Sequence, residues 1–406
     1  MKHITKKILY TNKSDITDAL FHEDCIFFDI ETTGFSPASC QLYLIGCLYK
    51  KDTDIIIEQF FAESPADEKD VLLHFMELLN RYTTIFSFNG LGFDLPFIKA
   101  KCKVLGISND FHAPASRRLK NGQTEDYQIE EHHTEEHHIK TLDYWDNFQY
   151  IDIFKEINRI KPLLLLPNYK QKTIETFLGI KRDDKYTGGE LISVYKEYVR
   201  TQDPIAEELL LLHNFDDVAG MLDLLPILSY VQILNGAYEI EHAETNPYTT
   251  YERTDGLELI LTLKNHCTVP KRISCAIKDY YLVMHNDITK IRIPIYEGEL
   301  KYFYPNHKDY FYLPIEDMAI HKSVASFVDK EFREKAKASN CYTRKMGRFL
   351  PQYETFINPF FKKEYKDKIS YFELTDEFME SNEMLQQYVE HVFAYMTKRK
   401  AFSPEK

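Results

Sequence analysis

Two acidic side chains lie two residues apart in a short apolar stretch. Asp29 and Glu31 fall within residues 25–31, a run that is otherwise apolar and aromatic and that Thr-Thr-Gly follows. Such a run predicts a buried β-strand, in which residues i and i+2 point to one face of the sheet. Two buried like charges repel and are costly to desolvate unless a cation compensates them. Carboxylate oxygens are the ligands that Mg²⁺ and Mn²⁺ prefer. The alternative is that the strand ends in water, where the two acids would need no ion.

Two more segments offer chemically useful side chains. Asp94 is the last residue of the stretch 86–94, in which an expected strand is followed by a glycine-bearing turn and then a helix. An acid at a helix N-terminus can also serve only to stabilise the helix, through its dipole. His213 and Asp217 are four residues apart in an expected long helix, so they share one face, as an ordinary surface pair would too. Together the four acids could surround two cations about 4 Å apart that activate a water and stabilise the leaving oxygen of a phosphodiester. His213 would orient or deprotonate that water, because imidazole titrates near neutral pH.

The elements around these residues predict an α/β fold with a mixed sheet flanked by helices. Expected strands in the first half cover residues 25–31, 42–49, 55–61 and 84–88, and expected helices cover residues 67–80, 95–105, 172–178, 188–200 and 205–225. After about residue 240 a tyrosine-rich alternation predicts a β-meander with strands at 257–263, 280–285, 290–296, 299–304 and 310–313, then helices at 323–337 and 373–398. We therefore expect a domain of residues 1–240 and a C-terminal α+β module of residues 241–406.

Three motifs resemble those of the DEDD superfamily of 3′→5′ exonucleases, which have a ribonuclease H-like fold. They are D-I-E-T-T-G at 29–34, N-G-L-G-F-D at 89–94 and H-N-F-D-D at 213–217. The YprB-like branch of that superfamily is the most similar, and residues 151–154, 173–180 and Gly188-Gly189 also resemble it. The resemblance covers about residues 22–235 and rests on the order and spacing of all three motifs.

The resemblance implies a role for each matching residue. The catalytic and metal-binding acids correspond to Asp29, Glu31, Asp94 and Asp217, with His213 as the fifth catalytic residue. Thr32 and Thr33 match positions that approach the terminal nucleotide, and Asn89 matches the polar residue of the second motif, so all three are predicted to bind substrate.

The third motif departs from the pattern of the family. Asp217 is preferred over Asp216 because tyrosine-type members have Y-x3-D, and His213 keeps that spacing. Histidine-type members have H-x4-D, but the fifth residue after His213 is Val218. A histidine in the tyrosine position leaves the identity and efficiency of the general base open, whereas the predicted metal site is unaffected.

Composition limits the remaining classes of protein. The 406 residues are 44% hydrophobic and 28% charged, close to the average for globular chains. The start of the chain has no apolar signal-peptide core, and no apolar run approaches the roughly 18 residues of a membrane span, so a cytoplasmic protein without a membrane partner is expected. Seven scattered cysteines without a C-x-x-C pair favour reduced thiols.

Charge favours particular places for nucleic acid. Residues 1–240 carry the whole net charge of −13, whereas residues 321–370 hold an excess of Lys and Arg. Candidate phosphate contacts there are Arg344, Lys345 and Arg348, and a solvated face is the alternative. A long loop is expected at about residues 109–144. Its Arg117, Arg118 and Lys120 could form a flap that binds phosphates. Its histidines could form a metal site, although a solvated loop is the stronger interpretation for them: His132, His133, His137 and His138.

We therefore expect a two-metal 3′→5′ exonuclease that uses two Mg²⁺ or Mn²⁺ ions and hydrolyses phosphodiester bonds at a single-stranded DNA or RNA 3′ end. One alternative is a non-catalytic nucleic-acid- or protein-binding module that keeps the ribonuclease H-like fold. Another is an endonuclease of the same fold. The choice between DNA and RNA stays open, because no motif reports on the 2′-hydroxyl.

Overall fold

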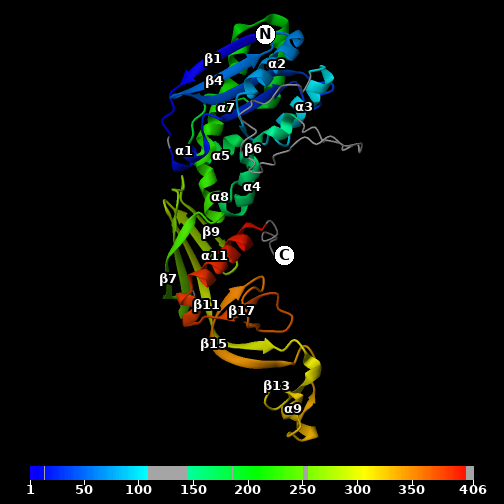
Figure 1. Cartoon of the computed structure of the whole chain (residues 1–406), viewed down its shortest axis with the longest axis vertical. Coiled ribbons are helices and arrows are strands. Elements are labelled where there is room, and N and C mark those ends of the chain that lie inside the picture. Colours follow the sequence, from blue (N-terminus) through cyan, green and yellow to red (C-terminus); the bar gives the residue numbers. More distant parts are fainter. Residues whose placement is uncertain (13, 108–143, 185, 250–254, 399–406) are drawn as a thin grey trace, which may run out of the picture. The chain divides into compact units, whose positions relative to one another are not determined.

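The computed structural model describes residues 1–12, 14–107, 144–184, 186–249 and 255–398 (Figure 1). The chain forms two compact units, one of Met1–Arg159 and Leu166–Val231, the other of Ile160–Leu165 and Gln232–Lys406. The expected domain boundary at residue 240 stays a prediction, because a compact unit is not yet shown to fold independently.

The first unit alternates strands and helices as the sequence predicts. Its strands are β1 (Lys2–Ile8), β2 (Cys25–Thr32), β3 (Leu42–Lys51), β4 (Asp54–Phe61), β5 (Thr84–Ser87) and β6 (Gln149–Asp152). Its helices are α1 (Asp15–Leu20), α2 (Glu68–Leu79), α3 (Asp94–Val104), α4 (Ile153–Leu164), α5 (Gln171–Leu178), α6 (Gly188–Thr201), α7 (Pro204–Leu224) and α8 (Leu228–Leu234), the last turn of α4 and the end of α8 belonging to the second unit.

The six strands form one mixed sheet in the order β1-β4-β3-β2-β5-β6. Strand β2 is antiparallel to β3 and parallel to β5, so it lies where the direction of pairing changes. The predicted mixed sheet flanked by helices is therefore confirmed. Strand β1, which the sequence analysis did not anticipate, extends the sheet by pairing with β4.

Neighbouring residues of β2 point to opposite faces of the sheet. The ring of Phe28 lies 5.2 Å from the ring of Phe75 on α2, whereas the carboxylate of Asp29 lies 3.1 Å from Nδ2 of Asn214 on α7. Helices α2 and α7 therefore cover different faces. The face that carries Asp29 is the one that α7 covers.

Helix α7 is more apolar than the sequence analysis anticipated. The stretch Pro204–Leu234 is long and apolar enough to cross a membrane by length and composition, with a mean hydropathy of 1.4. However, 67% of its most apolar window is buried inside the protein, where α7 packs on β2, β3 and β4. This packing accounts for the apolar composition.

The second unit is built mainly of antiparallel strands. They are β7 (Tyr238–Thr249), β8 (Asp255–Asn265), β9 (Ile273–Ile277), β10 (Tyr280–His285), β11 (Ile288–Phe303), β12 (Tyr310–Leu313), β13 (Met318–His321), β14 (Glu334–Lys335), β15 (Tyr342–Gln352), β16 (Phe360–Phe361) and β17 (Ser370–Glu373). Its other helices are α9 (Lys322–Ala325), α10 (Asp376–Glu380) and α11 (Asn382–Thr397). Helix α11 lies against the sheet, where Phe393 contacts Tyr238 and Tyr388 contacts Tyr280 (Figure 1).

The predicted C-terminal β-rich module is confirmed, but several of its elements differ from the prediction. The two strands predicted at 290–296 and 299–304 are one strand, β11, which ends at Phe303, because Gly298 pairs with Gly347 of β15 instead of forming a turn. The predicted helix at 323–337 is wrong, since α9 is short and β14 pairs with β12. The predicted helix at 373–398 is divided at Ser381, whose hydroxyl accepts a hydrogen bond from the backbone N–H of Met384 and caps α11.

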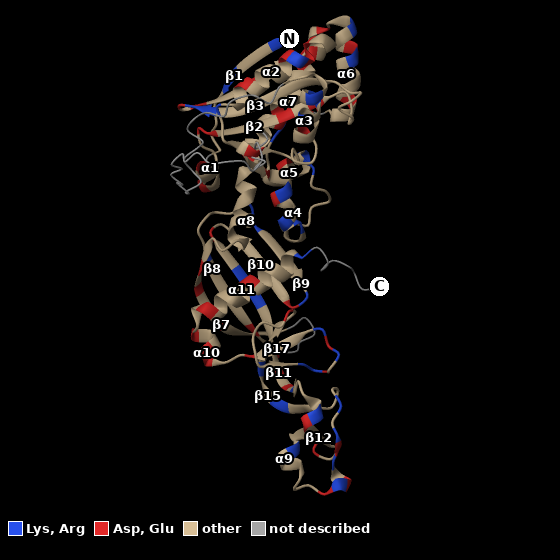
Figure 2. Ribbon diagram, turned by 45° about the vertical axis from the view of Figure 1, so that its right-hand side comes forward, with Lys and Arg blue, Asp and Glu red and all other residues tan. Residues whose placement is uncertain are grey.

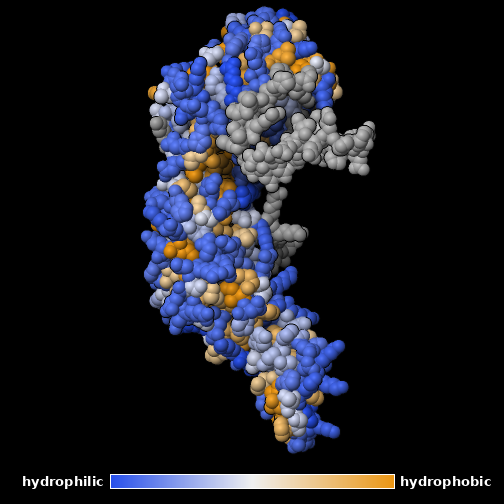
Figure 3. All heavy atoms as spheres, in the orientation of Figure 1, coloured by the Kyte–Doolittle hydropathy of each residue, from blue (hydrophilic) through white to orange (hydrophobic). Residues whose placement is uncertain are grey.

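Hydrophobic side chains on the surface form small separate patches among hydrophilic ones on the face that Figure 3 shows. This distribution is normal for globular proteins, in which single exposed apolar residues need no special explanation.

The close approach of α7 to the sheet depends on Gly46. Gly46 is the antiparallel partner of Asp29 on β3. A Cβ atom at this position would lie 2.1 Å from Oδ1 of Asn214 and 2.9 Å from Cγ2 of Val218. A larger residue would therefore push α7 away from the acidic face of β2.

We predict that Gly46→Ala lowers the free energy of unfolding by about 1–3 kcal/mol, because the core must expand to accept the methyl group. Urea denaturation measures the change. The matched control is Gly189→Ala on α6, where an added Cβ meets no atom within 4 Å, and we expect no loss of stability there. Equal effects of the two substitutions would contradict the packing described here.

Candidate metal centre

The sheet and α7 bring Asp29 and Glu31 into a common space with Asp217. Asp29 and Glu31 alternate with Ile30 on β2, and Glu31 is buried with 7% of its surface exposed. Asn214 donates a hydrogen bond to Oδ2 of Asp29, while its own Oδ1 accepts one from Gln59 on β4. The amide of Asn214 therefore fixes the carboxylate of Asp29 to α7.

Asp94 joins this space from the first turn of α3. Its Oδ1 atom accepts a hydrogen bond from the backbone N–H of Ile30, between the two acids of β2. The turn before α3 is held by Asp152, whose carboxylate accepts hydrogen bonds from the backbone N–H groups of Asn89 and Leu91. Asp152 thus supports the backbone that presents Asp94.

His213 and Asp217 face Glu31 from consecutive turns of α7. The Nε2 atom of His213 lies 3.2 Å from Oδ2 of Asp217 and 3.7 Å from Oε1 of Glu31. Ligand atoms of these three residues all lie within 4.8 Å of one another, so they could hold one metal ion. The structure therefore brings together all five residues that the sequence predicted to be catalytic. Their catalytic roles stay predictions.

The other ring nitrogen of His213 is held by a residue that the sequence analysis missed. Oδ2 of Asp184 lies 2.7 Å from Nδ1 of His213, and the side chain of Asp184 is almost completely buried. Burial acts to raise the pKa of Asp184, but hydrogen bonds from Lys172, from the backbone N–H of Tyr186 and from His213 lower it below its usual value. Since an ionised carboxylate only accepts hydrogen bonds, Nδ1 carries a proton and Nε2 is directed at the acids.

Arg182 partly neutralises the site. Its Nη2 atom lies 2.6 Å from Oδ1 of Asp217, and its Nη1 atom lies 3.0 Å from both carboxylate oxygens of Glu175. Asp216, the alternative to Asp217, instead accepts hydrogen bonds from the backbone N–H groups of Asp183 and Asp184. Asp216 thereby holds the loop that carries Arg182 and Asp184 against α7.

Burial and mutual repulsion make the acids reluctant to ionise. Burial raises the pKa of Asp29 well above its usual range, and the charges of Asp217 and Asp94 raise it further. The pKa of Glu31 is raised for the same reasons. Burial raises the pKa of Asp94 to about 7, although the hydrogen bond from Ile30 opposes the shift.

This donor set fits a divalent cation. Asp29, Glu31, Asp94 and Asp217, which we call the acidic cluster, supply carboxylate oxygens, and hard cations such as Mg²⁺ and Mn²⁺ prefer oxygen ligands. A bound cation would offset the repulsion that raises the pKa values of the buried acids. Arg182 offsets part of the charge of Asp217, so a cation that binds Oδ1 must replace this ion pair.

The predicted substrate-binding residues border the acidic cluster but make local contacts. Thr32 donates a hydrogen bond to the backbone carbonyl of Gly34, and the hydroxyl of Thr33 accepts one from the backbone N–H of Gln41. Asn89 has a positive φ of 64°, which the turn before α3 requires. Their predicted contacts with a nucleotide stay predictions.

The three candidate phosphate contacts of the second unit are all paired with acids. Arg344 and Arg348 on β15 pair with Glu299 and Glu297 on β11, and Lys345 pairs with Glu373 on β17. Phosphate would have to compete with these carboxylates. The other candidates, Arg117, Arg118, Lys120, His132, His133, His137 and His138, lie outside the described residues.

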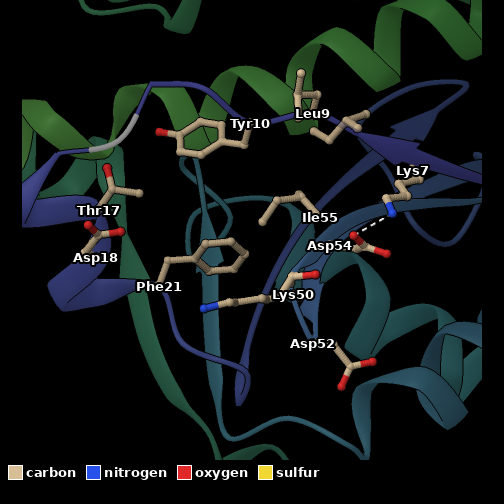
Figure 4. A pocket seen from close by; sticks show the side chains of 12 residues that line it. Lys7, Leu9, Tyr10, Thr17, Asp18, Phe21, Lys50, Asp52, Asp54 and Ile55 are labelled. Atoms are coloured by element: carbon tan, nitrogen blue, oxygen red, sulfur yellow. Dashed lines mark ion pairs between the residues drawn. The ribbon is translucent and has the colours of Figure 1, made fainter.

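A separate hollow of about 640 Å³ in the first unit has different chemistry. It lies between β1, α1 and the turn joining β3 to β4, and the ion pair of Lys7 with Asp54 lies at its wall (Figure 4). None of the four acids of the cluster lines it. It is therefore not the candidate metal centre.

The sequence analysis did not identify Lys172, Arg182 and Asp184 as part of the site. Arg182 and Asp184 lie in the loop between α5 and α6, and Lys172 on α5 donates a hydrogen bond to Asp184. The charged run Lys181-Arg182-Asp183-Asp184 was a visible signal, but a charge run in a loop has no periodicity that would assign it to a site. Asn214 lies inside the third motif, between His213 and Asp217, and its neighbours were the only hint of its role.

A family model described as the RNase H superfamily matches residues 26–229. The match covers the strands and helices that carry the acidic cluster and is consistent with the predicted ribonuclease H-like fold. No curated protein matches the sequence.

Solved structures show only distant similarity. The family B DNA polymerase of Pyrobaculum calidifontis is 14% identical with a TM-score of 0.35, over 68% of this chain and 33% of the polymerase. A zinc-bound complex of E. coli ExoI with ssDNA is 11% identical with a TM-score of 0.27, over 59% of this chain and 54% of ExoI. The chain thus spans about a third of the polymerase and about half of ExoI. At these TM-scores the similarity supports no functional argument.

We predict that Asp94→Asn stabilises the metal-free protein at pH 8. The pKa of Asp94 is raised to about 7 in the folded protein, against 3.8 for an unperturbed aspartate, so the folded state binds the proton more tightly. Stability from this group is therefore present at low pH and is lost as the pH rises from about 4 to about 7. Asparagine keeps the acceptor for Ile30 without the charge, and we expect a melting temperature about 2–4 °C higher for each kcal/mol relieved.

Thermal unfolding in EDTA at pH 8 measures this effect, with Glu77→Gln on the exposed face of α2 as the control. Saturating Mn²⁺ should raise the melting temperature of the wild type more than that of Asp94→Asn. A variant that melts below the wild type in EDTA, with an unchanged response to Mn²⁺, would contradict repulsion within the cluster.

Proposed function

The chain belongs to the RNase H superfamily, and from this premise we propose that it is a metal-dependent 3′→5′ exonuclease acting on single-stranded nucleic acid. The family match supports a nuclease. The observation that carries the proposal is the meeting of Glu31 and Asp217 with two further acids, beside Nε2 of His213. The proposal includes the YprB-like branch, two Mg²⁺ or Mn²⁺ ions and a cytoplasmic location.

The acidic cluster would hold the cations, which supply Lewis-acid stabilisation of the charge that develops on the phosphodiester. Asp29 and Glu31 bind from β2, Asp94 from α3 and Asp217 from α7. Rigid elements therefore fix all four ligands, which reduces the reorganisation needed during the reaction.

His213 would act on the attacking water through Nε2. Asp184 holds the proton of Nδ1, so the lone pair of Nε2 is directed towards the acids and can accept a proton from a water there. Asp184 is then a positioning residue, because it acts through the imidazole. In this proposal the histidine in the tyrosine position of the third motif serves as the general base.

The alternative of a non-catalytic binding module is favoured by one observation, the ion pair between Arg182 and Asp217. A permanent ion pair at this ligand would disfavour cation binding. A protein that binds an oligonucleotide but is not stabilised by Mn²⁺ and releases no mononucleotide would support this alternative.

We predict that Asp29→Asn abolishes Mg²⁺-dependent digestion of a single-stranded oligonucleotide, with a loss of about 10³-fold or more, because several kcal/mol of charge stabilisation disappear. A substrate labelled at its 5′ end should yield a ladder that shortens from the 3′ end. Circular single strands and strands with a blocked 3′ end should persist, and their cleavage would indicate an endonuclease. Glu77→Gln is the control, and undiminished digestion by Asp29→Asn would refute the assignment of the site.

We also predict that Asp184→Asn lowers kcat by about 10²-fold or more while KM changes little, because the amide can bind the imidazole in the wrong tautomer. Asp183→Asn in the same loop is the matched control, since the side chain of Asp183 is exposed. Steady-state kinetics and melting temperatures separate positioning from folding. If both substitutions changed kcat alike, or if Asp184→Asn acted only through lost stability, the positioning role would be wrong.

A further inference from the structure

A hollow of about 680 Å³ in the second unit lies where β11 ends. This volume is within the range of roughly 300–1,000 Å³ typical of ligand sites. Six of its lining residues carry the argument below: Tyr302, Phe303, Tyr304, Phe360, Tyr365 and Lys362. We call this hollow the aromatic pocket.

The aromatic pocket keeps part of its ring surface accessible. Tyr302, Phe303 and Phe360 are only half-buried, and 43% of Tyr365 is exposed. The rings of Phe303 and Tyr365 meet edge to face, with centroids 5.3 Å apart. By contrast, Tyr280 on β10 and Tyr388 on α11 are fully buried, with their rings in contact. The pocket rings are therefore not simply part of the core.

Positive charge exceeds negative charge beside the aromatic pocket, where residues 362–368 hold four lysines, one glutamate and one aspartate. The ammonium group of Lys362 donates a hydrogen bond to the backbone carbonyl of Asp367. Lys363 lies over the ring of Tyr296, 4.4 Å from its centroid. Within the described part of the chain, no ion pair involves Lys362, Lys363, Lys366 or Lys368. Figure 2 shows blue segments of this loop beside β17.

Nearby basic residues behave differently. Lys345 and Arg348 on β15 each pair with a glutamate of an adjacent strand. The basic side chains of β15 are therefore compensated by carboxylates. Those of the loop from Lys362 to Lys368 form no ion pairs with the residues that the structure describes and are available to a ligand. This loop borders the rings of the aromatic pocket.

Aromatic rings next to uncompensated lysines match the chemistry of a nucleotide in a single strand. A base stacks on an aromatic face whatever its sequence, and lysines attract the phosphate that joins it to the next base. An acidic peptide would satisfy the lysines but would leave the rings without a stacking partner.

We infer that the aromatic pocket binds a nucleotide of single-stranded nucleic acid, with the base against Phe360 and Tyr365 and a phosphate at Lys362 and Lys366. The ligand class rests on the proposed function. The pocket shares no lining residue with the acidic cluster. It requires neither cations nor catalysis, so it is testable without turnover.

The test is binding of fluorescein-labelled dT16 and rU16 to the full chain in EDTA, followed by fluorescence anisotropy. Tyr365→Ala and Phe360→Ala should each weaken binding at least about fivefold, because stacking on one ring is lost. Tyr365→Phe keeps the ring and should keep the affinity. Lys264→Ala on β8, whose charge is compensated by Asp287 and which does not line the pocket, should change it less than twofold. Comparison of the two oligonucleotides shows whether the pocket prefers DNA or RNA.

A second readout locates the contact directly. Oligonucleotides carrying 5-iodouracil should cross-link under ultraviolet light to tyrosine or phenylalanine residues of the aromatic pocket, which peptide mass spectrometry identifies. The inference is overturned if the wild type does not bind in EDTA, or if Tyr365→Ala binds as the wild type with cross-links only elsewhere. It is also overturned if hexaglutamate, but not unlabelled dT16, displaces the probe. If the wild type binds the oligonucleotide at the aromatic pocket but digests none, the proposed nuclease function is rejected and the inference about the pocket stands.

Discussion

Repulsion among buried carboxylates is the constraint on which the rest of the first unit depends. Burial and the neighbouring negative charges raise the pKa values of Asp29, Glu31 and Asp94, so the cluster is costly to ionise. Among the four acids of the cluster, Arg182 forms an ion pair with Asp217, and Asn214 offers Asp29 a hydrogen bond rather than a charge. A stable fold would gain more from replacing such acids by apolar residues. Their presence together is understandable if cations complete the site.

The scaffold around the cluster follows from this need to hold charges close together. Gly46 lets α7 approach β3, Asn214 joins α7 to Asp29, and the backbone N–H of Ile30 holds Asp94. Further along α7, Asp216 holds the loop that delivers Asp184 to His213. One helix therefore carries a candidate metal ligand, the candidate general base and the anchor of Asp184, the residue that contacts that base.

The sequence predicted the part of this arrangement that spacing encodes. Asp29 and Glu31 share a face because they alternate on a strand, and His213 and Asp217 share one because they are a helical turn apart. Asp184 could not be found in this way, since a loop has no period and its partner lies 29 positions later. In the second unit, composition favoured a helix at 323–337, but pairing of Glu334 and Lys335 with β12 overrode that local preference. The sequence divided β11 into two strands on either side of Gly298, because the facing glycine, Gly347, is distant in sequence.

The most direct test of a cation site in the acidic cluster is anomalous X-ray diffraction from crystals of the full chain grown with Mn²⁺. The account predicts anomalous density among the carboxylates of Asp29, Glu31, Asp94 and Asp217, about 2.0–2.3 Å from their oxygens, and the number of peaks would decide between one ion and two. Well-ordered carboxylates with no anomalous density between them, and with Arg182 still paired to Asp217, would contradict it.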